Sequence, residues 1–171
     1  RAKELLNMAI VSDEKSFGKE HPTTARRYSN LALLIKDMGD YSGAKILLEK
    51  ALIANVRFFG TEHPITATCY SNLGTVHQFL GNFNEAKVLL VKAMHSNEKT
   101  FGFNHSTTAQ SYSNLALVLK EMGHYKQAEE LLKKAMVINE KNFGIEHPSS
   151  ATCYSNLATV LQDMGDFTGA K

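Results

Sequence analysis

The sequence predicts an all-α protein, a right-handed superhelical solenoid of antiparallel helical hairpins. One observation is a period of 42 residues, at which the dipeptide Phe-Gly recurs from Phe17 onward. Periods of this length are typical of solenoids. A second observation is that apolar residues follow helical spacing in two segments of each period. A third is that proline and glycine lie where these segments begin and end.

The first helix of a repeat is predicted from one apolar stripe. In the first copy this stripe includes Tyr28, Leu31, Ala32 and Ile35. Three of the four copies place proline at the start of this helix, where a missing N–H is tolerated because the first turn has no acceptor for it. The helix should stop at Gly39, a residue suited to the left-handed turn after a helix end.

The second helix of a repeat follows after a short turn. Ala44, Leu48 and Ala51 belong to a stripe with the i, i+4, i+7 spacing of an amphipathic helix, which should run to about Phe59. Because small residues alternate with large ones, the two helices can pack closely. Each repeat is therefore predicted to be an antiparallel helical hairpin.

The period divides the chain into copies of this hairpin. We expect an unpaired second helix at 1–16, repeats at 17–58, 59–100 and 101–142, and a partial repeat at 143–171. Each repeat of a solenoid contacts only its neighbours, so residues 1–171 should form one elongated domain. Both ends follow the internal apolar pattern and lack polar capping. The segment is therefore expected either to come from a longer array or to associate head to tail.

These residues resemble the tetratricopeptide repeat signature, which matches Tyr28-x2-Leu31-Ala32, then Gly39, Ala44-x3-Leu48 and equivalent positions in the other copies. The 42-residue period and the junction Phe-Gly-x-Glu-His-Pro are similar to the longer repeats of kinesin light chains and their relatives. The resemblance implies a protein-interaction scaffold.

Composition disfavours several other classes. The formal charge is +2 with interspersed signs, so the basic stripe expected of a nucleic-acid-binding protein is missing. No apolar run approaches the roughly 20 residues that span a bilayer. Cys69 and Cys153 occupy equivalent positions two repeats apart, too far for a disulfide, and should be small buried residues. A cytoplasmic location without membrane or nucleic-acid partners is expected.

Catalytic chemistry is not expected. Four histidines recur in phase, His21, His63, His105 and His147, but they lie about one repeat apart, and no two of them can share a zinc ion. They should instead fix the junction through a hydrogen bond or a stacking contact. No base is consistently placed beside a serine. We therefore predict no enzyme activity, no metal and no cofactor.

The candidate binding surface lies on the concave side, which the first helices should line. The core uses the stripe through Tyr28, so the groove face of the first copy should hold Arg26, Asn30 and Leu33. The asparagine recurs in all four copies as Asn30, Asn72, Asn114 and Asn156. In the resembled family, asparagines at this position hold the ligand backbone. The alternative interpretation is a hydrogen bond to a neighbouring helix or to local backbone.

The predicted function is binding of an extended peptide or partner segment. An amide can pair with both the N–H and the C=O of any peptide, and one asparagine would meet roughly every third peptide residue. Residues that differ between copies should select the ligand: Arg26, Leu33, Thr75, Phe79 and Leu117. Thr159 is a further candidate peptide-binding residue on the same face. Phe79 is either an exposed anchor or a space-filling neighbour of Phe83. His77, which replaces an aliphatic residue, should find one hydrogen bond.

A different class of function is also open. The same array could be a structural, sensor or self-associating segment of a larger multidomain signalling protein.

Overall fold

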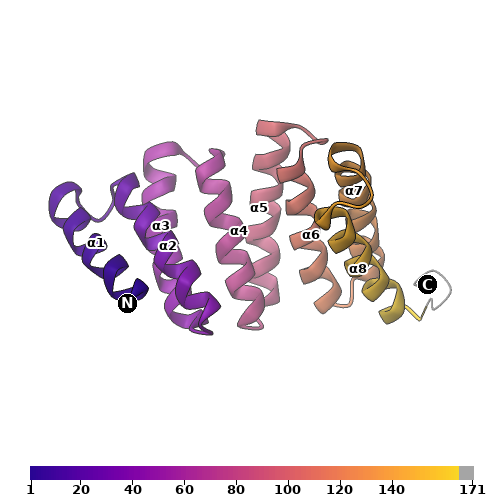
Figure 1. The fold of residues 1–171 in the computed structure, drawn as a ribbon, viewed down its shortest axis with the longest axis horizontal. Helices are drawn as coiled ribbons and strands as arrows, with labels where there is room; N and C mark the ends of the chain where they lie inside the picture. The colour runs from indigo at the N-terminus through magenta and orange to yellow at the C-terminus, as the bar shows by residue number, and fades with distance from the viewer. Residues whose placement is uncertain (166–171) are drawn as a thin grey trace. The chain divides into compact units, whose positions relative to one another are not determined.

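The computed structural model describes residues 1–165, and within them the chain forms eight consecutive helices (Figure 1). They are α1 (Ala2–Phe17), α2 (Pro22–Asp37), α3 (Tyr41–Phe59), α4 (Pro64–Phe79), α5 (Phe83–Phe101), α6 (Ser106–Glu121), α7 (Tyr125–Phe143) and α8 (Pro148–Asp163). The end of the partial repeat, 166–171, lies outside the described residues.

The chain divides into two compact units, Arg1–Ala93 (unit 1) and Met94–Lys171 (unit 2), and the boundary falls within α5. In unit 1, α1 packs on α2, α2 on α3 and α3 on α4, while α2 also contacts α4. In unit 2, α6 packs on α7 and α7 on α8, with a further contact between α6 and α8. Helices adjacent in the sequence are therefore paired, which confirms the predicted hairpins.

The predicted apolar stripes form the core. In unit 1, Tyr28, Leu31 and Ile35 of α2 are buried together with Leu48 and Ala51 of α3. In unit 2, a corresponding cluster includes Tyr112 of α6 and Ala135 of α7. Helix ends also agree with the sequence: α2 ends just before Gly39, whose φ of 86° belongs to the left-handed region that glycine tolerates best.

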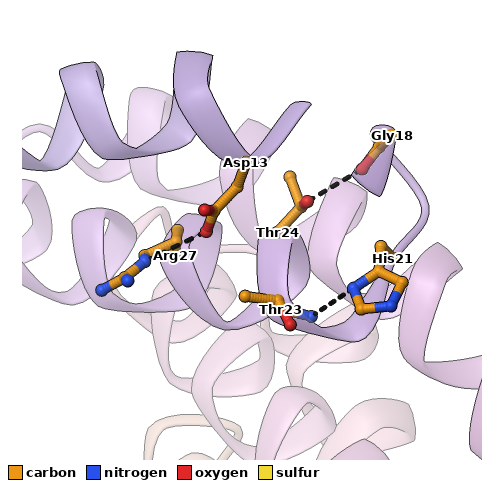
Figure 2. A network of polar contacts seen from close by, with 6 residues as sticks. All are labelled: Asp13, Gly18, His21, Thr23, Thr24 and Arg27. Atoms are coloured by element: carbon orange, nitrogen blue, oxygen red, sulfur yellow. Dashed lines mark hydrogen bonds and ion pairs between the residues drawn. The ribbon is translucent and has the colours of Figure 1, made fainter. Parts of the chain in front are cut away.

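The junction between repeats is held by one set of contacts, and Figure 2 shows the hydrogen bonds of its first occurrence. His21 Nδ1 accepts a hydrogen bond from the N–H of Thr23 at 3.2 Å and so caps α2. The rings of Phe17 and His21 stack with their centroids 5.0 Å apart. The hydroxyl of Thr24 donates to the carbonyl of Gly18 at 2.8 Å. The predicted role of the histidines in fixing the junction is confirmed.

The same contacts recur at each later junction. The capping histidines are His63, His105 and His147, each stacked on the phenylalanine four residues earlier. The hydroxyls of Thr66, Thr108 and Ser150 donate to the carbonyls of Gly60, Gly102 and Gly144, at 2.8 Å in every case. The junction motif is thus a hydrogen-bonded turn that sets the start of every first helix.

Replacing Thr108 by valine should destabilise the protein by about 1–3 kcal/mol. Valine has the shape of threonine, but it leaves the Gly102 carbonyl without the donor that the fully buried hydroxyl supplies. Urea denaturation followed by circular dichroism measures the change. The matched control is Thr107→Val, because Thr107 is exposed and only its backbone N–H takes part in the cap. Equal stability of the two variants would contradict the assigned role.

In three of the four copies, the tyrosine of the first helix donates a hydrogen bond to a glutamate of the preceding second helix. Tyr28 donates its hydroxyl to Glu14, and Tyr112 donates to Glu98 at 2.8 Å. Burial and the bonded Glu98 carboxylate raise the pKa of Tyr112 to about 12. At the equivalent point of the second copy the acceptor is replaced by Val56.

Candidate functional site

A cavity of about 510 Å³ lies in unit 1 among α2, α3 and α4. Its α2 wall comes from one face of the helix, and α4 supplies the facing wall, while α3 contributes the residues between them. The lining residues are Pro22, Thr23, Arg26, Ser29, Asn30, Leu33, Asn55, Phe59, Ile65, Thr68, Cys69 and Asn72. A volume of this size is within the range of ligand pockets in proteins.

Four of the sequence-predicted binding residues meet in this cavity: Arg26, Asn30, Leu33 and Asn72. They come from α2 and α4, the first helices of two successive repeats. Among the residues that the structure describes, the side chains of Asn30 and Asn72 have no hydrogen-bond partner, and Arg26 has no ion-pair partner. These polar groups are therefore available to a bound molecule.

The walls between these polar groups are largely apolar. Leu33 lies on α2, Phe59 ends α3, and Ile65 is in the first turn of α4. Apolar walls with a few convergent polar groups are the usual composition of a binding pocket. The guanidinium of Arg26 is a permanent cation, so the cavity favours neutral or acidic groups near this residue.

The remaining predicted residues lie outside this cavity. In unit 2 the Asn114 oxygen accepts a hydrogen bond from Gln110 Nε2 at 2.8 Å, a side-chain contact within α6 that neither of the two interpretations predicted. Thr75 and Thr159 donate their hydroxyls to carbonyls one turn earlier in their own helices. Asn156 and Leu117 are half-buried on α8 and α6.

Phe79 lies at the end of α4, where 55% of its side chain is exposed. Its ring stacks on that of Tyr41 from α3, with centroids 4.9 Å apart and planes inclined by 7°. The predicted ring neighbour was Phe83, whereas the ring contact within the described residues is with Tyr41. Phe79 is thus an exposed aromatic side chain that the structure does not bring to the cavity.

His77 is buried in α4, with only 7% of its surface exposed. The predicted hydrogen bond is wrong: within residues 1–165 the imidazole has no partner, and its Nδ1 is enclosed by protein. Burial, followed by the nearby charge of Lys45, lowers the pKa of His77, against smaller opposing effects of Glu85 and Glu49. The ring is therefore held neutral in a position that other copies fill with leucine or isoleucine.

One group of side-chain contacts at the junctions was not predicted from the sequence. Asn55 on α3 is 4% exposed, lines the cavity and donates from Nδ2 to Cys69 Sγ at 3.5 Å. No described residue donates a hydrogen bond to its Oδ1. Because that oxygen is not fully enclosed by protein, it is accessible from the cavity. Burial raises the pKa of Cys69, and its thiol is therefore unreactive at neutral pH.

The same pair of positions recurs at every junction. Asn97 donates to Ser111 at 2.8 Å, and Asn139 donates to Cys153 at 3.3 Å. At the first junction the two residues are charged: Arg27 Nε lies 3.1 Å from Asp13 Oδ2, as Figure 2 shows. The recurrence of asparagine at residues 55, 97 and 139 was the signal in the sequence.

Other kinds of site find no support in the part of the chain that the structure describes. No group of three or more histidine, cysteine or acidic side chains could hold a metal ion in residues 1–165. Over the same residues, no helix combines the length and the apolar character needed to cross a membrane. The predicted burial of Cys69 and Cys153 is confirmed, since both are free thiols with 2% exposure.

Comparison with known proteins agrees with this architecture. The TPR-like repeats of a kinesin light chain from Podosopora anserina are 28% identical and superpose with a TM-score of 0.84, covering 99% of this chain and 80% of theirs. BtubC (BKLC) from P. vanneervenii is 24% identical, with a TM-score of 0.87 over 99% of this chain and 67% of its own.

The apo form of RapI is a more distant match, 18% identical with a TM-score of 0.74, over 85% of this chain and 51% of RapI. A search of the curated proteins gave no match. The sequence profile of the tetratricopeptide repeat matches residues 28–99 and 107–171, which together make up most of the chain. The hairpins, their junctions and this match agree, and the chain belongs to the tetratricopeptide repeat family.

Proposed function

We propose that this protein is an interaction scaffold that binds an extended peptide segment along its first helices. Tetratricopeptide repeat domains are generally protein-interaction scaffolds. The observation that carries the peptide-binding role is the cavity of about 510 Å³ that contains Asn30 and Asn72. Both amides lack internal hydrogen-bond partners among the described residues, and each can pair with one N–H and one C=O of a peptide backbone.

Selectivity would come from the groups around the two amides. Arg26 is a cation without an ion-pair partner among residues 1–165, and Leu33 and Ile65 offer apolar contacts. Backbone pairing to asparagine is independent of the peptide sequence, whereas these three side chains contact only suitable ligand side chains. The cavity is therefore expected to hold peptides of many sequences weakly and a subset of them more tightly.

The test is selection of short linear peptides from a random displayed library on the intact chain, followed by affinity measurement with wild type and the double variant Asn30→Ala, Asn72→Ala. We expect the affinity to fall by about tenfold or more, because two contacts to the peptide backbone are lost. The matched control is Asn7→Ala with Asn84→Ala, which removes two exposed asparagines from α1 and α5 outside the cavity.

Circular dichroism of each variant shows whether the fold is kept. Binding that is unaffected by the cavity substitutions, or that falls equally in the control, would refute the proposed role of the asparagines. The Arg26→Ala variant then reports separately on charge selectivity.

A further inference from the structure

Unit 2 contains a second cavity, of about 470 Å³, which shares no residue with the cavity of unit 1. It is formed by residues from the end of α5, the junction between α5 and α6, α6 and α7. Its lining includes Phe103, Asn104, Tyr112, Lys133, Lys134 and Val137. We call these six residues the junction niche.

Sister repeats show which of these residues the fold requires. The position of Phe103 is lysine, threonine and isoleucine at the other three junctions, as Lys19, Thr61 and Ile145. All four junctions nevertheless adopt the same capped turn. The turn therefore needs no aromatic residue, and 66% of the Phe103 side chain is exposed to water.

Two further departures change the charge of the niche. Asn104 takes the place of a glutamate that is present at every other junction, as Glu20, Glu62 and Glu146. Lys133 stands where the first repeat has Glu49. Relative to its sister positions, the niche has lost negative charge and gained a positive one.

The three residues that differ from the equivalent positions of other repeats, Phe103, Asn104 and Lys133, all line this cavity. Val137 lines the same cavity as Phe103, and 58% of its side chain is exposed, so two large apolar side chains of this cavity are in contact with solvent. Lys134 has no ion-pair partner within the described residues, while Lys133 is 2.7 Å from Glu129. Glu98 also lines this cavity. One oxygen of its carboxylate accepts the Tyr112 hydroxyl, and the other lies 3.3 Å from His95 Nδ1.

We propose that the junction niche docks a partner segment in which a bulky apolar side chain lies next to a carboxylate. The apolar side chain would pack between Phe103 and Val137 and remove both from water. The carboxylate would pair with Lys134, whose ammonium is the available cation, with Lys133 adding to the positive potential. A cationic segment is disfavoured by the same two lysines.

This proposal is independent of the peptide-binding role of Asn30 and Asn72, because it concerns a different cavity in a different unit. The test is a selection of short linear peptides from a random displayed library on the intact chain. The affinity of each selected peptide is then measured for Phe103→Thr and Lys133→Glu. These substitutions introduce the residues that other repeats have at the equivalent positions, Thr61 and Glu49. The matched control is Ile145→Thr, which removes an equally exposed apolar residue, 67% exposed, from the next junction.

We expect a class of selected peptides that carry aspartate or glutamate next to a large apolar residue. Their affinity should fall about tenfold or more on Phe103→Thr, as for an interface anchor, and should fall on Lys133→Glu in a salt-dependent manner. Binding should be unchanged on Ile145→Thr and on the Asn30→Ala, Asn72→Ala variant.

Three outcomes would overturn the proposal: no selected peptide distinguishes wild type from Phe103→Thr, the distinguishing peptides lack acidic residues, or binding is lost only in the asparagine variant. Sedimentation adds a fourth, since self-association that is abolished by Phe103→Thr would assign the niche to a second copy. If the substitutions of Asn30 and Asn72 do not affect the binding of any peptide, the acidic peptides that depend on Phe103 should still be found. The two proposals can therefore be refuted separately.

Discussion

The His77→Leu variant is expected to be more stable than the wild type by about 1–3 kcal/mol at neutral pH. His77 is 7% exposed and its Nδ1 has no hydrogen-bond partner within the described residues, so folding removes a polar atom from water without compensation. Leucine occupies the equivalent position in the third and fourth copies, as Leu119 and Leu161. The urea midpoint, followed by circular dichroism, measures the gain.

The pH dependence of stability gives an independent readout. The pKa of His77 is lowered on folding from its ordinary value of about 6.5, so the unfolded chain binds the proton more readily. Stability should therefore decrease as the pH falls below about 6.5, and the decrease continues until the pKa of the folded state is reached. His77→Leu should lack this component, which appears as a difference between the two pH profiles.

The control for both measurements is His124→Leu, which removes an exposed histidine that makes no capping bond at the start of α7. This variant should keep the loss of stability on acidification that is assigned to His77. A leucine variant that is less stable than wild type, or that loses stability with acid to the same extent, would show that His77 is not a buried neutral base.

The Leu48→Ala variant is expected to lose about 2–5 kcal/mol, the larger of the two effects. Leu48 is completely buried in α3 and belongs to the core cluster of unit 1 with Ala32 and Leu73. Truncation removes apolar contacts and leaves a cavity that rigid helices on both sides cannot fill.

Ile46→Ala is the matched control for Leu48→Ala, because Ile46 lies two residues earlier on the same helix and is 55% exposed. We expect the control to change stability by less than about 0.5 kcal/mol. Thermal and urea unfolding of both variants provide the comparison. A control as damaging as Leu48→Ala would mean that α3 buries a different face.

The helices and turns were predictable because each hairpin has the same apolar spacing and the same glycine position. Apolar spacing located α2 and α3, and Gly39 located the turn between them, since glycine tolerates its φ of 86°. The convergence of Asn30 and Asn72 followed from assigning the stripe through Tyr28 to the core. Once one face of a helix is assigned to the core, the helical period determines which residues lie on the opposite face.

Contacts that depend on packing between repeats were not predictable in the same way. Asn55 and Cys69 are separated by a helix end, a junction and a helix start, and their contact requires the relative rotation of α3 and α4. The stacking of Phe79 on Tyr41 depends likewise on how two helix ends meet. The environment of His77 was only partly predictable. Its position on the apolar stripe indicates that the side chain is buried, but the sequence does not show whether a hydrogen-bond partner lies within reach.

The pair of interacting side chains at each junction determines which segment of the chain could be duplicated without loss of these contacts. Arg27 requires Asp13 from the preceding helix, whereas Cys69 requires an amide, supplied by Asn55. If one hairpin were transplanted to another place in the array, Arg27 would face an amide and lose its counter-charge. A segment that begins with a second helix and ends with the next first helix would keep every such pair together if it were duplicated.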